Sequence, residues 1–447
     1  MKNTFVVSCP IDTYSGYGAR SRDYVKSLIE LDKYDVKVLP QRWGGTPKGF
    51  IDNHPEWEFL NKHLIGPQLT EKPDIWCQVT VPNEFQPVGK YNIGLTAGIE
   101  TTACAPQWIE GCNKMDLILC SSNHSKNVFE QTVYQAKNKE TGQTHDLKLQ
   151  KPIKVLIEGA NLDLYKPLNK TSDFKSIELY KDLNLIKEDF AYLFVGHWMQ
   201  GSMGEDRKNV GLLVKAFYEL FKNKTKIPAL ILKTSTAGAS YLDRKEIQKR
   251  LKFIRDTIPS NKLPNIYLLH GEFSDVEMNE IYNHPKIKSM VNLTKGEGFG
   301  RPLLEFSLTN KPVITTGWSG HTDFLDSELT SLLGGKLTDI HPSAQMKDML
   351  IEGSKWFSVD HGQIGHYLND VFENYKEYKV KGKRQGYKSR TDFSFEMMKK
   401  QLDEILIEFI PDFPKQVELK LPKLNKIELP KLKKVELPKL KKVETNG

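Results

Sequence analysis

The chain has 447 residues, 39% of them hydrophobic and 27% charged, which is enough for two domains with substantial cores. Its net charge of +8 is unevenly placed. Residues 417–447 hold nine lysines and four glutamates, or +5 (nine minus four), so the remainder is only weakly basic. No apolar run is long enough to span a bilayer, so we expect no transmembrane segment.

The start of the chain and its cysteines favour a cytoplasmic protein. The segment MKNTFVVSCPIDTY lacks the apolar core and small-residue cleavage site of a signal peptide. The five cysteines are odd in number, and none forms a Cys-x2-Cys pair. This usage argues against a zinc site or a disulfide framework and favours free thiols.

The first part of the chain alternates apolar runs with helical stretches. A glycine turn in SGYGARSRDYVKSLIE opens a helix with Val25, Leu28 and Ile29 on one face. Six runs have the character of buried strands: residues 4–8, 35–39, 75–79, 93–96, 117–120 and 155–158. The alternation predicts a parallel sheet covered by helices on both faces.

A second alternating series begins near Ala191. Its predicted strands read AYLFVG, PALILK, NIYLLHG, KSMVNLT and PVITT, and its helices include VGLLVKAFYELF and PLLEFSLT. Residues 158–190 form the candidate connection between the two series. Two doubly wound α/β domains that face each other bring the C-terminal ends of both sheets to one cleft, where such folds bind ligands.

The end of the chain contains a helix and a repetitive tail. The sequence pattern of residues 388–409 predicts a final amphipathic helix. From residue 417 the repeats IELPKLKK and VELPKLKK place prolines every eight residues, which excludes a continuous helix and leaves too little apolar surface for a core. The tail is extended or disordered, pairs as an added strand with a partner, or is a lysine-rich arm for an anionic polymer.

The segment that most clearly indicates a function is residues 294–314, TKGEGFGRPLLEFSLTNKPVI. It places Glu297 in a loop and Glu305 about two turns into a helix, eight residues further on. The two carboxylates can accept hydrogen bonds from hydroxyl groups, and the helix N-terminal amides between them suit phosphate oxygens. A nucleotide-sugar presents sugar hydroxyls, a diphosphate and ribose hydroxyls in that order. A capped helix with incidental glutamates is the alternative.

This Glu-x7-Glu spacing, with EGFG at its head, resembles the signature of retaining, family-4-type glycosyltransferases of the GT-B fold. The resemblance covers residues 4–409, and the sequence motifs are most similar to those of enzymes encoded by large tailed phages. It implies an α/β protein of two doubly wound Rossmann-like domains facing across a cleft. The expected parts are an acceptor-side domain (1–165), a nucleotide-sugar-binding domain (166–385), a terminal helix that returns to the first domain (386–412) and the Lys/Pro-rich tail (413–447).

The resemblance also implies how the donor is held. Glu297 would bind a donor-sugar hydroxyl, and Glu305 the ribose hydroxyls. The amides under the sugar and diphosphate would come from Gly298, Phe299 and Gly300, where a missing β-carbon lets backbone approach closely.

The phrase FVGHWMQGSMGEDRKNVGLLVKAF is similar to the phosphate-binding strand and helix of that family. Lys208 matches its lysine, and Arg207 is a second candidate. The usual arginine is replaced by His197, so either Arg207 or Arg301 would complete the basic pair. Lys233, at the end of a predicted strand, points into the cleft or is simply solvated.

Two further segments resemble donor-binding loops. Gly16 and Gly18 match a glycine loop over the donor phosphates. Arg20 and Arg22 in the following turn either reach a phosphate or are exposed. Residues 270–273 would contact the base through their backbone, unless His270 is a structural cap.

The expected catalytic residues are Glu297, Glu100 and Lys208. The family commonly places a histidine near the reacting sugar, but IGLTAGIETT has none, and Glu100 or the Thr101-Thr102 pair takes that position. Glu100 is a polar partner or a covalent nucleophile, or the acceptor is positioned differently. We favour front-face substitution assisted by the leaving phosphate. The chain has no strict Asp-x-Asp, so we expect no metal and no cofactor beyond the donor substrate.

The acceptor is the least defined part. Phage enzymes of this kind modify hydroxymethylated cytosine in DNA, virion proteins or host-surface glycans. The net positive charge and the lysine-rich tail favour DNA, with the tail as its docking arm. A glycan or protein acceptor, a sugar-nucleotide epimerase and a silent binding module are the alternatives.

Overall fold

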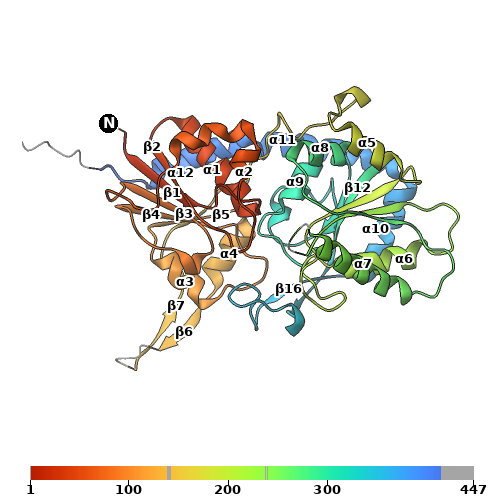
Figure 1. Ribbon diagram of the computed structural model, residues 1–447. Helices are drawn as coiled ribbons and strands as arrows, with labels where there is room; N and C mark the ends of the chain where they lie inside the picture. The colour runs from red at the N-terminus through yellow and green to blue at the C-terminus, as the bar shows by residue number, and fades with distance from the viewer. Residues whose placement is uncertain (1, 138–141, 237, 239, 414–447) are drawn as a thin grey trace, which may run out of the picture. The chain divides into compact units, whose positions relative to one another are not determined.

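The computed structural model describes residues 2–137, 142–236, 238 and 240–413 (Figure 1). Its first sheet consists of six parallel strands: β1 (Thr4–Cys9), β2 (Asp35–Pro40), β3 (Ile75–Val79), β4 (Tyr91–Leu95), β5 (Leu117–Cys120) and β8 (Ile153–Val155). The strand order is β2-β1-β3-β4-β5-β8. The associated helices are α1 (Gly16–Leu31), α2 (Phe50–Asn53), η1 (Pro55–His63), η2 (Pro82–Glu84), α3 (Pro106–Asn113) and α4 (Asn123–Gln131). An antiparallel hairpin pairs β6 (Tyr134–Lys137) with β7 (Thr144–Leu147).

The second sheet is also parallel and six-stranded. Its strands are β9 (Ala191–Val195), β10 (Ala229–Lys233), β11 (Ile266–Leu269), β12 (Ile287–Asn292), β13 (Val313–Thr316) and β14 (Ser331–Leu333). Their order is β11-β10-β9-β12-β13-β14. An antiparallel pair follows: β15 (Gly335–Asp339) and β16 (Lys355–Val359). The helices are η3 (Thr171–Asp173), α5 (Ile177–Asn184), α6 (Val210–Phe221), α7 (Tyr241–Asp256), α8 (Asp275–Asn283), α9 (Arg301–Ser307), η4 (Gly320–Asp323), η5 (Pro342–Ala344), α10 (His361–Glu373), α11 (Tyr375–Asp392) and α12 (Phe395–Phe409).

Each sheet reverses its direction of growth once, between β1 and β3 in the first and between β9 and β12 in the second. In open α/β sheets, ligands bind outside the carboxyl ends of the strands at such a switch point. The predicted fold class, two doubly wound Rossmann-like domains, is confirmed. Both sheets belong to one compact unit that ends at Pro411. The division into four parts stays a prediction, and the tail from residue 414 lies outside the described residues.

The cores follow from the two-residue period of the buried strands. Along β9, Tyr192 and Phe194 pack with α6, α7 and α10, whereas Leu193 and Val195 pack with α5, α8 and α9. In the first sheet, α3 and α4 cover one face, and Figure 1 shows α1 and α12 together on the other. Both sheets are therefore covered on both faces, which leaves their strand ends for ligand binding.

The terminal helix differs from the prediction of one helix over residues 388–409. The chain ends α11 at Asp392 and starts α12 at Phe395, where the Ser394 side chain accepts a hydrogen bond from the amide of Met397. The reason lies across the chain. The Ala160 amide donates to the Phe393 carbonyl, and the Ala160 carbonyl accepts from the Phe395 amide, at 2.9 Å each. The backbone groups of Phe393 and Phe395 therefore form a β-bridge with Ala160 and do not continue the helix. The α12 segment then packs against α1.

The last strand of the first sheet is also shifted, from the predicted residues 155–158 to Ile153–Val155. Side chains replace the sheet partners beyond it. Arg20 donates to the carbonyls of Leu156 and Ile157, and the Ile157 amide donates to Gln401 Oε1 at 3.0 Å. All five cysteines are free and buried. None of the helices in the described ranges is long and apolar enough to cross a membrane.

Candidate active site

The EGFG segment connects β12 to α9 at the switch point of the second sheet. Gly300 precedes α9 at φ 99°, in the left-handed region that only glycine adopts freely. The Glu297 amide donates to Ser319 Oγ at 2.9 Å, and its carbonyl accepts from the Gly320 amide at 2.9 Å. These bonds fix the turn to the loop after β13 and hold the Glu297 side chain in a buried position.

Two cations reach Glu297 from the loop between β9 and α6. The Arg207 carbonyl accepts from the Lys295 amide at 2.7 Å, which ties this loop to the one after β12. Lys208 Nζ donates to Glu297 Oε1. The Arg207 guanidinium donates to the Gly296 carbonyl at 2.8 Å and lies 3.5 Å from Glu297 Oε2. Three residues predicted from two separate motifs therefore form one cluster.

Glu100 joins this cluster from the first sheet. Its Oε1 lies 3.9 Å from the Arg207 guanidinium, on the segment that follows β4. Burial alone raises the pKa of Glu297, but Lys208 and Arg207 outweigh it and lower that pKa to about 2. Burial lowers the pKa of Lys208, although Glu297 opposes the shift. Two cations and two carboxylates thus balance one another at the carboxyl ends of the strands.

Lys233 supplies a further positive charge at the same edge of the sheet. It ends β10, its ammonium lies 5.7 Å from the centre of the Phe273 ring, and it forms no ion pair with any described residue. His197, the residue in place of the usual arginine, has its pKa lowered by burial and by Lys233, Lys208 and Arg207. A neutral histidine therefore stands among three cations. Lys233 is the cation most open to an incoming anion.

Glu305 lies on α9, where its Oε1 accepts from Arg301 Nε at 2.9 Å and its Oε2 from the Tyr282 hydroxyl at 3.2 Å. Burial raises the pKa of Glu305 to about 7, although Arg301 opposes the rise. Arg301 also binds Asp23 at 2.6 Å and lies 3.9 Å from Glu158. Three carboxylates thus surround Arg301, and its role as the second member of the basic pair stays a prediction.

The glycines of the EGFG turn bring two loops into contact. A β-carbon on Gly296 would overlap the Glu100 carbonyl, and one on Gly298 would overlap the Ala97 carbonyl. Ser121 Oγ also donates to the Gly298 carbonyl at 3.3 Å. The missing β-carbons let the loop after β4 approach this turn. Phe299 is buried in the core of the second sheet, and the roles of the turn amides toward a donor stay predictions.

The first glycine loop has a mixed outcome. Gly16 is exposed with open space around it, whereas a β-carbon on Gly18 would overlap the Thr13 carbonyl. Gly18 therefore closes the turn itself, and its contact with donor phosphates stays a prediction. Between them, the ring of Tyr17 stacks on Trp43 with a centroid distance of 3.9 Å.

The expectation that Arg20 and Arg22 are exposed is wrong, and their contact with a phosphate stays a prediction. Both are buried, and Arg22 donates to the carbonyls of Ile11 and Thr13 at 2.9 Å each. They serve the packing of α1. The His270 side chain bonds to Asp243 at 2.6 Å, so its ring is part of the structure around α7.

Two histidines that the sequence reasoning missed lie close to the site. His124 packs edge-on against Trp318, and burial lowers its pKa to about 4 while the backbone of Thr101 opposes the shift. It therefore contacts the same loop that lacks a histidine of its own. His321 is fully buried and bonds to the Thr316 carbonyl at 2.6 Å. Burial lowers its pKa, so the imidazole is neutral. Each histidine lies a few residues after a predicted strand, but no sequence motif marks either of them.

Among the described residues, no group of three or more His, Cys, Asp or Glu side chains is arranged to hold a metal ion. The positive charge at the strand ends comes from Arg207, Lys208 and Lys233.

Comparison with known proteins identifies the fold but no family. No protein-family model matches the chain, and no curated protein sequence does. A glycosyltransferase structure from Rickettsia africae matches with a TM-score of 0.59 and 15% identity, over 92% of this chain and 100% of that one. HepE from Anabaena, in complex with UDP and glucose, gives 0.56 and 13%, over 91% and 100%. Sucrose-phosphate synthase from Thermosynechococcus elongatus gives 0.57 and 10%, over 91% and 99%. At such low identities the likeness establishes the fold alone, and that fold is GT-B.

Proposed function

We propose that this protein is a glycosyltransferase that moves a sugar from a nucleotide-sugar to a hydroxyl acceptor. The observation that carries the proposal is the meeting of Arg207 and Lys208 with Glu297 at the switch point of the second sheet. Structures of the same fold support it: HepE holds UDP-glucose, and a trehalose-6-phosphate protein from E. coli holds UDP-2-fluoro glucose. A UDP-sugar is therefore the first donor to test.

In this proposal each part of the donor contacts different residues of the site. Arg207, Lys208 and Lys233 bind the diphosphate, Glu297 a sugar hydroxyl and Glu305 the ribose hydroxyls. Negative charge builds up on the departing diphosphate, and fixed cations stabilise it without further reorganisation. The three cationic side chains supply the positive charge that a divalent metal supplies to the diphosphate in other enzymes.

We further propose that the reaction retains the anomeric configuration through front-face substitution. The acceptor oxygen bonds to the anomeric carbon as the bond from that carbon to the diphosphate breaks, and the acceptor proton passes to the leaving phosphate oxygen. The Glu100 carboxylate lies 3.9 Å from Arg207, which favours a role in holding this cation over nucleophilic attack.

A turnover assay tests the proposal. A panel of UDP- and other nucleotide-sugars is incubated with the protein, and nucleotide release is measured with and without acceptor. A transferase releases nucleotide faster when an acceptor is present. An epimerase converts the donor without an acceptor, and a silent binding module binds it without turnover, so either result contradicts sugar transfer.

For the acceptor we propose hydroxymethylated cytosine in DNA. The net charge of +8 supports it, because cations attract the phosphate backbone. The test is incubation with hydroxymethylcytosine DNA and an active donor, followed by mass spectrometry of the nucleosides. Absence of a hexose or pentose mass shift, with a donor that the enzyme hydrolyses, rejects DNA and directs the search to glycan and protein acceptors.

A further inference from the structure

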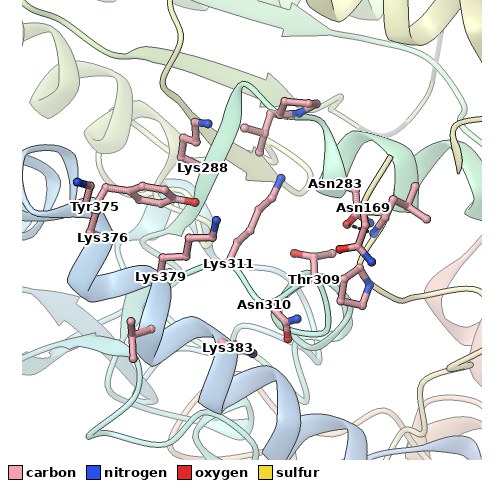
Figure 2. A pocket seen from close by; sticks show the side chains of 15 residues that line it. Asn169, Asn283, Lys288, Thr309, Asn310, Lys311, Tyr375, Lys376, Lys379 and Lys383 are labelled. Carbon is pink, nitrogen blue, oxygen red and sulfur yellow. Dashed lines mark hydrogen bonds between the residues drawn. The ribbon is translucent and has the colours of Figure 1, made fainter. Parts of the chain in front are cut away.

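A hollow lies at the opposite end of the second sheet, away from the candidate active site. Its volume is about 600 Å³, and it is lined where β12 and β13 begin, by the start of α11 and by the segment before η3 (Figure 2). The carboxyl ends of these strands carry the proposed donor site, so this hollow is not part of it. Its polar lining residues are Asn169, Asn283, Lys288, Thr309, Asn310, Lys311, Tyr375, Lys376, Lys379 and Lys383.

Lysines dominate this hollow. Figure 2 shows the ammonium ends of Lys288, Lys311 and Lys379 turned toward one shared space, with the hydroxyl of Tyr375 beside them. No aspartate or glutamate lines the hollow. Within the described ranges, neither Lys288 nor Lys379 forms an ion pair. The positive charge is therefore concentrated, and no lining side chain neutralises it, although the charge of Asp189 acts on Lys288 from outside the lining.

Lys311 is held in place by the protein itself. Its ammonium donates to the carbonyls of Tyr282 and His284, at 2.7 and 3.0 Å, at the end of α8. Burial lowers its pKa well below the usual value, and Lys288 and Lys379 lower it further. Like charges that repel across a partly buried space are unfavourable unless an anion shares that space.

Tyr375 adds a neutral hydrogen-bond donor. Burial raises the pKa of its hydroxyl to about 12, so the proton stays on the oxygen at any physiological pH. A tyrosine hydroxyl among ammonium groups suits an oxyanion with several acceptor oxygens.

We propose that this hollow binds a small molecule that carries two or more phosphate charges, such as a diphosphate or a phosphate ester. Its volume is typical of a small-molecule site. A compact group of lysines around one space, with Lys288 and Lys379 free of ion pairs among the described residues, matches a compact anion better than the extended backbone of a nucleic acid, which requires a stripe of positive charge. The site is separate from the proposed donor site and does not depend on glycosyl transfer.

Isothermal titration of the full chain with inorganic pyrophosphate tests the proposal. Lys288→Ala and Lys379→Ala should each weaken pyrophosphate binding at least tenfold. Lys381→Ala is the matched control, because Lys381 lies on α11 together with Lys379 but does not line the hollow. The control should bind pyrophosphate as the wild type does.

Pyrophosphate can also bind at the donor site, and the variants separate the two sites. If Lys288→Ala and Lys379→Ala bind it with wild-type affinity and stoichiometry, the anion occupies only the donor site and the proposal is wrong. A single-stranded oligonucleotide provides the second arm. If it binds more tightly than pyrophosphate and loses affinity in the same two variants, the occupant is a nucleic acid and the small-molecule proposal is overturned. Thermal melting of each variant shows that it is folded.

Discussion

At the scale of single residues, the Lys208–Glu297 pair decides whether the cluster is structural or catalytic. Both side chains are buried, at 10% and 8% exposure, so each charge depends on the other. Lys208→Met should lower the free energy of unfolding by about 3 kcal/mol, the lower end of the cost of breaking a buried pair. The cost is at that end because Arg207 remains 3.5 Å from Glu297. Urea unfolding measures it.

The double variant Lys208→Met/Glu297→Leu is the control. Removing both charges should restore most of the lost stability, because no buried carboxylate is left without its lysine. Donor turnover should stay abolished in both variants. If the double variant regains turnover together with stability, the pair has a structural role only, and the diphosphate and sugar contacts assigned to it are wrong.

The pKa of Glu305 predicts opposite pH effects on stability and on donor binding. Burial raises this pKa from 4.5 to about 7, so between these values the folded protein holds a proton that the unfolded chain releases. The stabilisation is complete below pH 4.5 and is lost as the pH rises through about 7. Relative to Glu305→Gln, the wild type should therefore lose free energy of unfolding over this interval.

Affinity for UDP should change in the other direction. A carboxylate accepts hydrogen bonds from both ribose hydroxyls, whereas a protonated carboxyl donates one of its own. Between about pH 6 and pH 8, UDP binding by the wild type should therefore strengthen more than that by Glu305→Gln, in which only the terminal phosphate of UDP titrates. Parallel profiles for the two proteins would contradict the assignment of ribose to Glu305.

At the scale of elements, the sequence predicts a strand or helix best where one local pattern decides it. The predicted strand at residues 75–79 and the helix VGLLVKAFYELF match β3 and α6 residue for residue, because a buried apolar run and the apolar face of a helix are local signals. The end of α11 and the end of β8 depend on partners elsewhere in the chain, Ala160 and Arg20 respectively. Strands β15 and β16 were not predicted, since β15 is largely exposed and lacks an apolar run.

The candidate site shows the same limit. Glu297, Arg207 and Lys208 were found because their motifs have fixed spacing, and the structure brings them together. His124 belongs to no such motif, and its nearness to Trp318 arises only from the fold. The ion pairs of Arg301 could not be predicted, because its carboxylate partners Asp23 and Glu158 lie in distant segments.

The contact between the EGFG turn and the loop after β4 gives a prediction at this scale. Gly298→Ala places a β-carbon on the Ala97 carbonyl, a backbone atom that has little freedom to move. The change should cost roughly 1–3 kcal/mol of stability, as for other overpacked sites. Gly16→Ala is the matched control, because nothing lies within 4 Å of its β-carbon position. Thermal unfolding compares them, and equal melting temperatures would mean that the two loops are not held together in solution.

At the scale of the whole molecule, the two sheets are linked by contacts that come from far apart in the sequence. Arg301 on α9 binds Asp23 on α1, and the Asn123 amide donates to Asp323 at 2.8 Å. The Thr102 amide likewise donates to the Lys355 carbonyl at 2.8 Å. The largest link is α12, which follows the helices of the second sheet and packs against α1 of the first. The first sheet should therefore depend on the last helix of the chain.

Removal of α12 tests this dependence. Four of its apolar side chains are buried, and each contributes about 1.5–3 kcal/mol. These side chains are Met398, Leu402, Ile405 and Leu406. Their loss, together about 6–12 kcal/mol, is comparable to the total stability of a domain, about 5–15 kcal/mol. A chain that ends at residue 394 should therefore show a separate, low-temperature unfolding transition of the first sheet in calorimetry, while the second sheet still melts cooperatively. A chain that ends at residue 413 keeps α12 and should melt like the full-length protein. If both truncated chains melt alike, α12 does not support the first sheet, and the terminal helix has no part in joining the two halves.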